Sequence, residues 1–224
     1  MKTRMRGEER HAAIVHSAIH LFAEKGFRGA TTRELASALG VTEPVLYRHF
    51  QTKRDLYRAI IEAKARQASE RADTLRKEAE SGDDRLFVTR LGESILQRYE
   101  KDPEMTRLLL YISLEGHELA GQFFERVFSD FYRVVLEYIR RRIQAGAFRQ
   151  MDAEVAARGL IGMIAYHGLV EQLFPGYFQK RSRQRVAREM AALFLDGVQR
   201  PEEPKPPAPR RDSANSSSSH STAS

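Results

Sequence analysis

The sequence predicts an all-α protein with about nine helices. Apolar residues recur every three to four positions through most of the chain, which is the spacing of one helix face. Glycine, proline and capping residues separate these apolar segments. No run of alternating β-branched residues indicates a strand. Together these observations favour packed helices over any architecture built on a sheet.

The first two predicted helices are short and have clear ends. The first covers about residues 9–25 and stops before Gly26, a residue suited to a left-handed C-terminal position. Thr31 and Glu34 have the spacing of a capping box, which opens the second helix. This second helix ends at Gly40, so a tight turn follows it.

The third helix is short and the fourth is long. Thr42 can cap the third helix, which runs to about residue 50. Thr52 and Asp55 repeat the capping-box spacing and open the fourth helix, which ends near Gly82. The fourth helix therefore connects the basic N-terminal part to the rest of the chain.

Glycine, proline and capping residues also bound the remaining helices, and Pro103 is suited to a first helical position. Four of them are predicted over 84–102, 118–145, 153–173 and 183–199, and a further helix begins at 103. The composition changes after residue 200, where five of the eight prolines fall in 201–209. Such a segment buries too little apolar surface to order itself. We therefore expect a domain over 1–57, a second over 58–199 and a disordered Pro/Ser-rich tail over 200–224.

The charge distribution points to a polyanionic partner. The chain has 224 residues, a net charge of +7 and no cysteine, which excludes disulfides, thiolate metal sites and cysteine nucleophiles. Residues 1–57 hold ten Lys and Arg against six Asp and Glu. The rest of the chain is nearly balanced in charge, so the basic terminal segment indicates contact with nucleic acid or an anionic membrane. No apolar run reaches the length of a membrane span and no signal-peptide pattern is present, so we expect a cytoplasmic protein without a membrane partner.

Residues 31–50 have the pattern of a helix-turn-helix. Leu35, Ala36 and Leu39 can pack against Leu46 and Phe50 across the turn. The second helix then presents polar and basic side chains outward, which plain helix packing does not require but does not exclude. The outward residues are Thr42, Glu43, Pro44, Val45, Tyr47, Arg48 and His49.

The N-terminal pattern also resembles the DNA-binding signature of the TetR (tetracycline repressor-like) family over about 47 residues without a gap. The matching positions are Arg10, Ile14, Ala18, Leu21, Phe22, Gly26, Phe27, Thr31, Thr32, Leu35, Ala36, Gly40, Val41, Leu46, Tyr47, Phe50, Lys53 and Leu56. The resemblance implies a homodimeric repressor with a three-helix DNA-binding domain, a helical ligand-binding and dimerisation domain, and release from palindromic operator DNA on ligand binding. Residues 58–199 resemble the family only in their layout of helices. Pro44 departs from the common pattern, in which a small residue is usual.

The resemblance implies that the third helix enters the major groove with its N-terminus first. Thr42, Glu43, Pro44 and Val45 would then lie nearest the base edges, with Glu43 accepting from a cytosine amino group. Arg48 could contact guanine or a phosphate. The remaining candidates would contact the phosphate backbone, and they are Thr32, Arg33, Tyr47, His49 and Lys53.

Polar residues on mostly apolar faces are the candidates for an effector site in the second domain. They are Arg107, Tyr111, Glu115, His117, Met163, His167 and Glu171. Aliphatic and aromatic walls with a few polar groups suit a small organic effector. The alternative is that these residues make rim hydrogen bonds or dimer contacts. A metal bound by His167, Glu171 and His117 is disfavoured, because no further histidine cluster or cysteine supports it, and no cofactor is expected.

The last two helices are the candidates for dimerisation. Gly162 and Ala165 would allow close helix approach, and the final helix adds Met190, Leu193 and Phe194. Two such helices from each subunit can form a four-helix interface about a two-fold axis. The alternative is that both helices pack within one subunit.

No catalytic constellation is present, because the sequence lacks a phosphate-binding glycine loop, a nucleophile motif and HExxH. We therefore expect a transcriptional regulator and no enzyme. The alternative is a helical small-molecule-binding or scaffold protein without sequence-specific DNA function. Residues 31–53 favour the regulator, because a binding module has no reason to present them. The sequence leaves repressor or activator, the operator and the effector open.

Overall fold

The computed structural model describes residues 7–115 and 119–199, which form α-helices joined by short loops. The helices are α1 Gly7–Gly29, α2 Thr32–Ala38, α3 Glu43–His49, α4 Lys53–Glu78, α5 Asp84–Lys101, α6 Pro103–Leu114, α7 Leu119–Phe123, the π-helical turn η1 Phe124–Phe128, α8 Ser129–Gln144, α9 Ala153–Leu173 and α10 Arg183–Val198. Over these residues no strand forms, and one isolated bridge joins Phe148 to Gln199. The all-α prediction is confirmed. The predicted tail over 200–224 lies outside the described residues.

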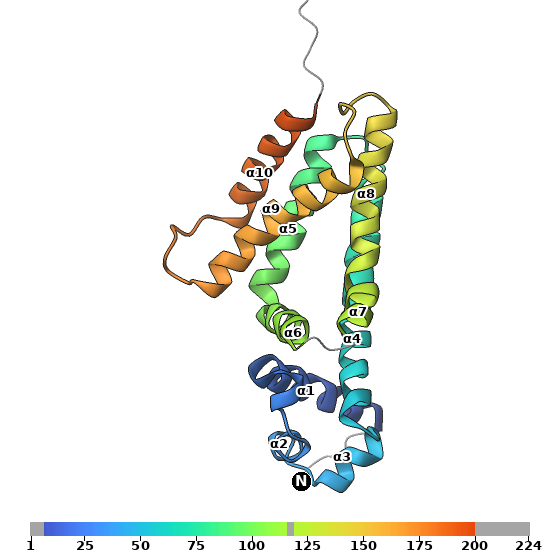
Figure 1. Ribbon diagram of the computed structural model, residues 1–224, viewed down its shortest axis with the longest axis vertical. Helices are drawn as coiled ribbons and strands as arrows, with labels where there is room; N and C mark the ends of the chain where they lie inside the picture. The colour runs from blue at the N-terminus through green and yellow to red at the C-terminus, as the bar shows by residue number, and fades with distance from the viewer. Residues whose placement is uncertain (1–6, 116–118, 200–224) are drawn as a thin grey trace, which may run out of the picture.

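The helices are arranged around a long spine made by α4 and α8 (Figure 1). Helices α1, α2 and α3 form a small unit at one end of the molecule, and α6 lies against α1. Helix α5 returns along the body, with α9 and α10 packed on it at the far end. The helix-turn-helix is therefore at one end, and the last two helices are at the other.

The first hydrophobic core joins the small N-terminal unit to the body. Phe22 of α1 and Tyr57 of α4 are fully buried, and their rings meet edge to face with centroids 5.2 Å apart. The same core includes Leu108 and Ile112 of α6. Helix α4 also runs without interruption through residue 57. The two predicted domains thus share apolar packing and one continuous helix.

The second core holds the far end together, where α5 packs against α8, α9 and α10. Phe87 and Phe148 are fully buried in it, as is Ile164 of α9. Gly92 allows α10 to approach α5 closely, because a Cβ added there would lie 3.1 Å from the Cβ of Ala187. This core also positions the residues that line the candidate effector pocket described below.

Two helix predictions need correction. The helix predicted over 118–145 is interrupted by η1, a stretch with one extra residue per turn that the apolar spacing does not reveal. The first helix was predicted to end at 25, but helical hydrogen bonding resumes after Gly26 and continues to Gly29. Gly26 itself has a φ of 74° and a ψ of 177°, so its φ is positive as expected but its backbone is extended and not left-handed helical.

Candidate nucleic-acid interface and effector pocket

The turn of the helix-turn-helix is built as the sequence predicts. Gly40 has a φ of 62°, and its N–H donates to the Ser37 carbonyl over 3.0 Å. The N–H of Val41 donates to the Ala36 carbonyl over 2.9 Å, which closes the end of α2. Leu35 and Leu46 are buried between the two helices. This packing fixes α3 rigidly relative to α2.

The outer face of α3 carries most of the predicted contact residues. Thr42, Pro44 and Arg48 are exposed, and Tyr47 keeps 45 % of its surface accessible. Thr42 occupies the N-cap position of α3, but its hydroxyl makes no capping hydrogen bond. That hydroxyl is therefore available to an external partner. The other three candidates on α3, which are Glu43, Val45 and His49, are half-buried.

Glu43 is held by α2. The hydroxyl of Thr32 donates to the Glu43 carboxylate over 2.9 Å, and the Arg33 Nε lies 3.8 Å from its other oxygen. The Tyr47 hydroxyl reaches back to Thr32 Oγ1 at 3.5 Å. Sequence reasoning placed Glu43 at a base edge, whereas in the structure it links the first turns of α2 and α3. Thr32 and Glu43 meet only through the tertiary turn, so their spacing in the chain gave no signal.

Lys53 lies at the first residue of α4, directly after the Thr52–Asp55 capping box. Its Nζ is 4.7 Å from the centroid of the Phe27 ring, a distance that allows a cation–π interaction. Burial lowers the pKa of Lys53 from its usual value, and the negative charges of Glu115 and Glu34 oppose that shift. The ammonium group is thus oriented at a helix N-terminus, where an anion is favoured.

Tyr111 and Glu115 lie at the junction between α6 and α1. The Tyr111 hydroxyl donates to the Glu24 carbonyl over 3.0 Å, and the Arg28 N–H donates to the Glu115 carboxylate over 3.1 Å. Gly26 makes this contact possible, because a Cβ there would lie 2.4 Å from Glu115 Oε1. Both residues were predicted to line an effector site. The structure places them in a contact that joins the body to the small unit formed by α1, α2 and α3.

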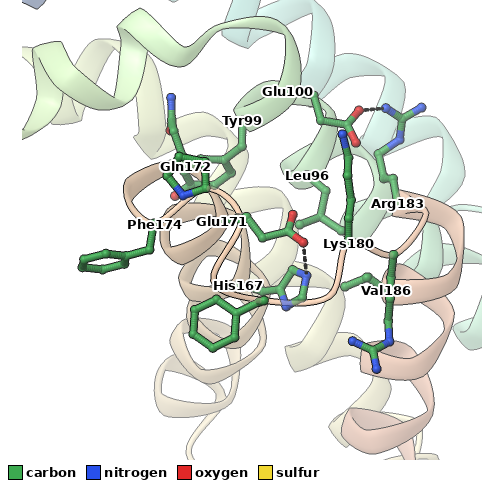
Figure 2. Close-up of a pocket in the computed structure, with 15 residues that line it drawn as sticks. Leu96, Tyr99, Glu100, His167, Glu171, Gln172, Phe174, Lys180, Arg183 and Val186 are labelled. Atoms are coloured by element: carbon green, nitrogen blue, oxygen red, sulfur yellow. Dashed lines mark hydrogen bonds and ion pairs between the residues drawn. The ribbon is translucent and has the colours of Figure 1, made fainter.

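A pocket opens between α5, α9, the start of α10 and the loop that connects α9 to α10 (Figure 2). Its volume is about 350 Å³. Aromatic and aliphatic groups form part of its wall, and basic side chains stand at its rim. The lining residues are Leu96, Tyr99, Glu100, His167, Gly168, Glu171, Gln172, Phe174, Pro175, Gly176, Phe178, Lys180, Arg181, Arg183 and Val186.

Polar groups in this pocket are incompletely satisfied. His167 Nε2 lies 3.5 Å from the Glu171 carboxylate but makes no hydrogen bond, and Gln172 Oε1 is buried without a partner (Figure 2). Arg183 and Glu100 form an ion pair across the opening. Buried polar atoms without partners are costly unless a ligand or water satisfies them. The pocket therefore offers hydrogen-bonding capacity beside an apolar wall.

Of the seven predicted effector residues, the structure brings only His167 and Glu171 into this pocket. Arg107 is exposed on α6, and Met163 packs against the second core. His117 lies outside the described residues. Sequence reasoning missed the wall formed by residues 174–183, although aromatic and basic residues concentrate there. Within residues 7–115 and 119–199 no three His, Asp or Glu side chains form a metal-binding group.

The predicted dimer residues divide into two groups. Gly162 is exposed on α9 and Leu193 on α10, where Leu193 keeps 66 % of its surface accessible. Ala165 and Met190 are partly buried against the second core. Phe194 turns inward, because its ring meets that of Phe148 with centroids 6.4 Å apart.

These features define a class of protein. A helix-turn-helix with an outward basic and polar helix is joined through a shared core to a helical body that contains a ligand-sized pocket. Among the described helices none is long and apolar enough to cross a membrane.

Comparison with known proteins identifies the family. Residues 14–60 match the model for bacterial regulatory proteins of the tetR family, and residues 89–197 match the C-terminal domain of AefR-like transcriptional repressors. The nucleoid occlusion factor SlmA of Marinobacter nauticus is 31% identical over 157 residues, which cover 67% of this chain and 75% of the relative.

Solved structures agree with this assignment. A tetR-family regulator from Mesorhizobium loti superposes with a TM-score of 0.67 at 20% identity, covering 88% of this chain and 100% of the other. AibR, in complex with isovaleryl coenzyme A and operator DNA, superposes with a TM-score of 0.66 at 20% identity, covering 83% and 97%. The chain belongs to the TetR family and is a DNA-binding transcriptional regulator.

Proposed function

We propose that the chain binds a palindromic operator as a homodimer through α3, and that it releases the operator when a small organic molecule occupies the pocket between α5, α9 and α10. The observation that carries this proposal is the connection between the two sites. Helix α5 lines the pocket, and it continues through Asp102 into α6, whose last turn contacts the DNA-binding unit.

The contacts proposed for the operator follow from the exposed face of α3. Thr42, Pro44 and Arg48 are accessible at the end of the molecule, and Thr42 has an unused hydroxyl. Arg48 can pair with guanine through two hydrogen bonds or contact a phosphate. Tyr47, His49, Thr32 and Arg33 lie beside this face and would contact the backbone, as would Lys53 at the start of α4. Glu43 and Val45 would act mainly by holding α3 in place.

The proposed dimer interface is the exposed face of α9 and α10. Tyr166 on α9 and Leu193 on α10 keep 69% and 66% of their surfaces accessible, so both can be buried against a second subunit. Gly162 lies on the exposed side of α9. A Cβ added at this position would have no atom within 4 Å, so a second helix can approach closely. One helix-turn-helix reads only a few base pairs, and a two-fold dimer doubles the contact.

The proposed effector is a partly apolar organic molecule with an acidic or carbonyl group. Tyr99, Phe174 and Phe178 offer an apolar wall, while Lys180 at the rim and His167 inside can contact a polar head. The acyl thioester ligand of the AibR complex supports this class of effector. The volume of about 350 Å³ suits a small ligand or the acyl part of a larger one.

The decisive experiment is to bind the purified full chain to DNA from upstream of its own gene. Footprinting locates the operator, and fluorescence anisotropy then follows its release as short-chain and medium-chain acyl thioesters and free carboxylic acids are titrated. A symmetric footprint that a ligand abolishes supports the proposal. Absence of any sequence preference would instead support the alternative of a helical ligand-binding or scaffold protein. We propose no catalytic activity, and an operator-binding protein of this kind works in the cytoplasm with the chromosome.

A further inference from the structure

A second cleft lies between α1, α4 and α5, away from the effector pocket. Its volume is about 360 Å³, and its lining is polar and basic. The residues that matter here are His16 of α1, Gln67 and Arg71 of α4, and Gln97, Arg98 and Lys101 of α5. None of them lines the pocket between α5, α9 and α10.

Three cations in this cleft have no acidic partner of their own. Among the described residues Arg71, Arg98 and Lys101 make no ion pair, whereas Lys64 in the same cleft pairs with Asp102. Arg98 stacks on Tyr99 with its guanidinium carbon 4.0 Å from the ring centroid, and its Nη1 is buried without a hydrogen-bond partner. A buried charged donor without an acceptor is costly.

The two carboxylates at the edge of the cleft are already engaged. Asp102 accepts from Lys64 over 2.6 Å, and Glu104 lies 2.9 Å from the His20 ring nitrogen. Neither carboxylate forms an ion pair with Arg71 or Arg98, although the charge of Asp102 still acts on Arg71. The pKa of Arg71 is lowered from its usual value, first by burial and then by the positive charge of Arg98, while the negative charges of Asp102 and Glu70 oppose the shift. Two guanidinium groups thus repel each other in a partly desolvated cleft.

We propose that the cleft between α1, α4 and α5 binds a compact multivalent anion, with phosphate or carboxylate oxygens accepting hydrogen bonds from Arg71 and Arg98. Planar guanidinium groups match these oxygens in paired hydrogen bonds. Gln67, Gln97 and Lys101 provide further donors. The anion would remove the repulsion between the arginines and satisfy the buried Arg98 nitrogen.

Operator DNA does not supply this anion. Arg71 lies 18 residues beyond Lys53 along α4, which is about 27 Å at 1.5 Å per residue. The cleft is thus remote from the face of α3 that contacts DNA. It is a ligand site additional to the proposed effector pocket, and its walls include α1 of the DNA-binding unit.

The test is calorimetric titration of the full chain with pyrophosphate and, separately, with citrate, at constant ionic strength maintained with chloride. We expect saturable binding of one anion per chain, at least tenfold weaker in the double variant Arg71→Gln, Arg98→Gln. Arg66→Gln is the matched control, because Arg66 is exposed on α4 outside the cleft, and it should bind as the unchanged protein does. Binding of pyrophosphate alone identifies phosphate as the recognised group, and binding of citrate alone identifies carboxylate.

A second measurement keeps the test independent of folding defects in the double variant. Lys101→Gln changes an exposed residue, so its fold should be unaffected, and it should weaken the anion several-fold. Thermal melting should also show ligand stabilisation, with the ratio of folded to unfolded protein rising about elevenfold at ten times the dissociation constant. Absence of saturable binding of both anions by the unchanged protein, or equal binding by the double variant, would overturn the proposal.

Discussion

The backbone N–H of Arg28 donates to the carboxylate of Glu115 over 3.1 Å, so the end of α6 is tied directly to the segment that precedes the helix-turn-helix. The Arg28 guanidinium returns the contact by donating to the Glu115 carbonyl over 3.1 Å. Gly26, beside Glu115, leaves the space that this approach needs. The end of α6 and the end of α1 are therefore in direct contact, although 87 residues separate them in the chain.

Removing the hydroxyl that supports this junction should weaken the fold. Tyr111→Phe deletes the donor to the Glu24 carbonyl, and we expect a loss of about 0.5–1.5 kcal/mol in the free energy of unfolding. Urea denaturation measures it. Tyr177→Phe is the control, because Tyr177 is 84% exposed and should tolerate the change. Equal stability of the two variants would show that the hydroxyl contact contributes nothing.

Arg48→Ala and Lys53→Ala should affect operator binding in different ways. Arg48 is exposed on α3, so its loss should cost about 1–3 kcal/mol on the operator and relax preference at one base position. Lys53→Ala should weaken all sequences alike and reduce the salt slope by about one unit. Fluorescence anisotropy on operator and scrambled DNA at several salt concentrations separates the two. The proposed orientation of α3 is wrong if Lys53→Ala alone alters sequence preference.

Leu193→Glu should separate the homodimer. The side chain is exposed in the isolated chain, so a charge there leaves the fold intact but cannot be buried in an apolar interface. Sedimentation should show monomers, and tight operator binding should be lost together with the dimer. Leu114→Glu is the control, since Leu114 is 83% exposed on a different face. A Leu193→Glu variant that remains dimeric would place the interface elsewhere. Phe194 is unsuitable for this test because it contributes to the second core.

His167→Ala should blunt induction, whereas Arg107→Ala should not. His167 lines the effector pocket with an unsatisfied ring nitrogen, and Arg107 is exposed on α6 outside it. Operator affinity without effector should stay close to that of the unchanged protein in both variants. Titration of effector into the operator complex measures the difference. Equal induction of the His167→Ala variant and the unchanged protein would remove the pocket from the mechanism.

Glu34 should make the stability of the N-terminal unit depend on acid pH. A hydrogen bond from Lys25, then those from Thr31, lower its pKa from 4.5 to about 2 in the folded chain. The stabilisation is therefore complete above pH 4.5 and is lost as the pH falls toward 2. Glu34→Gln should remove this part of the pH dependence. Denaturation midpoints between pH 5 and pH 2 check it, and parallel declines in both proteins would contradict it.

Local features of the chain were predictable because neighbouring residues determine them. The capping boxes at Thr31 and Thr52 and the positive-φ glycines at 26 and 40 depend on groups three or four residues apart. The outward face of α3 followed from helical spacing alone. By contrast, Tyr111 and Glu115 were predicted to line a pocket. Polar groups on an apolar helix do not indicate which helix will face them, so their contact with α1 could not be predicted.

The sequence by itself determined the class of this protein, since helix signals and the helix-turn-helix residues lie within contiguous segments whose chemistry is local. Tertiary structure decided where the sites are. Residues 87 positions apart meet at the α1–α6 junction, as Arg28 and Glu115 do, and the effector pocket joins α5 to the start of α10. These contacts depend on the angles at which the helices cross. The packing of both hydrophobic cores sets those angles, and no single segment of the sequence specifies that packing.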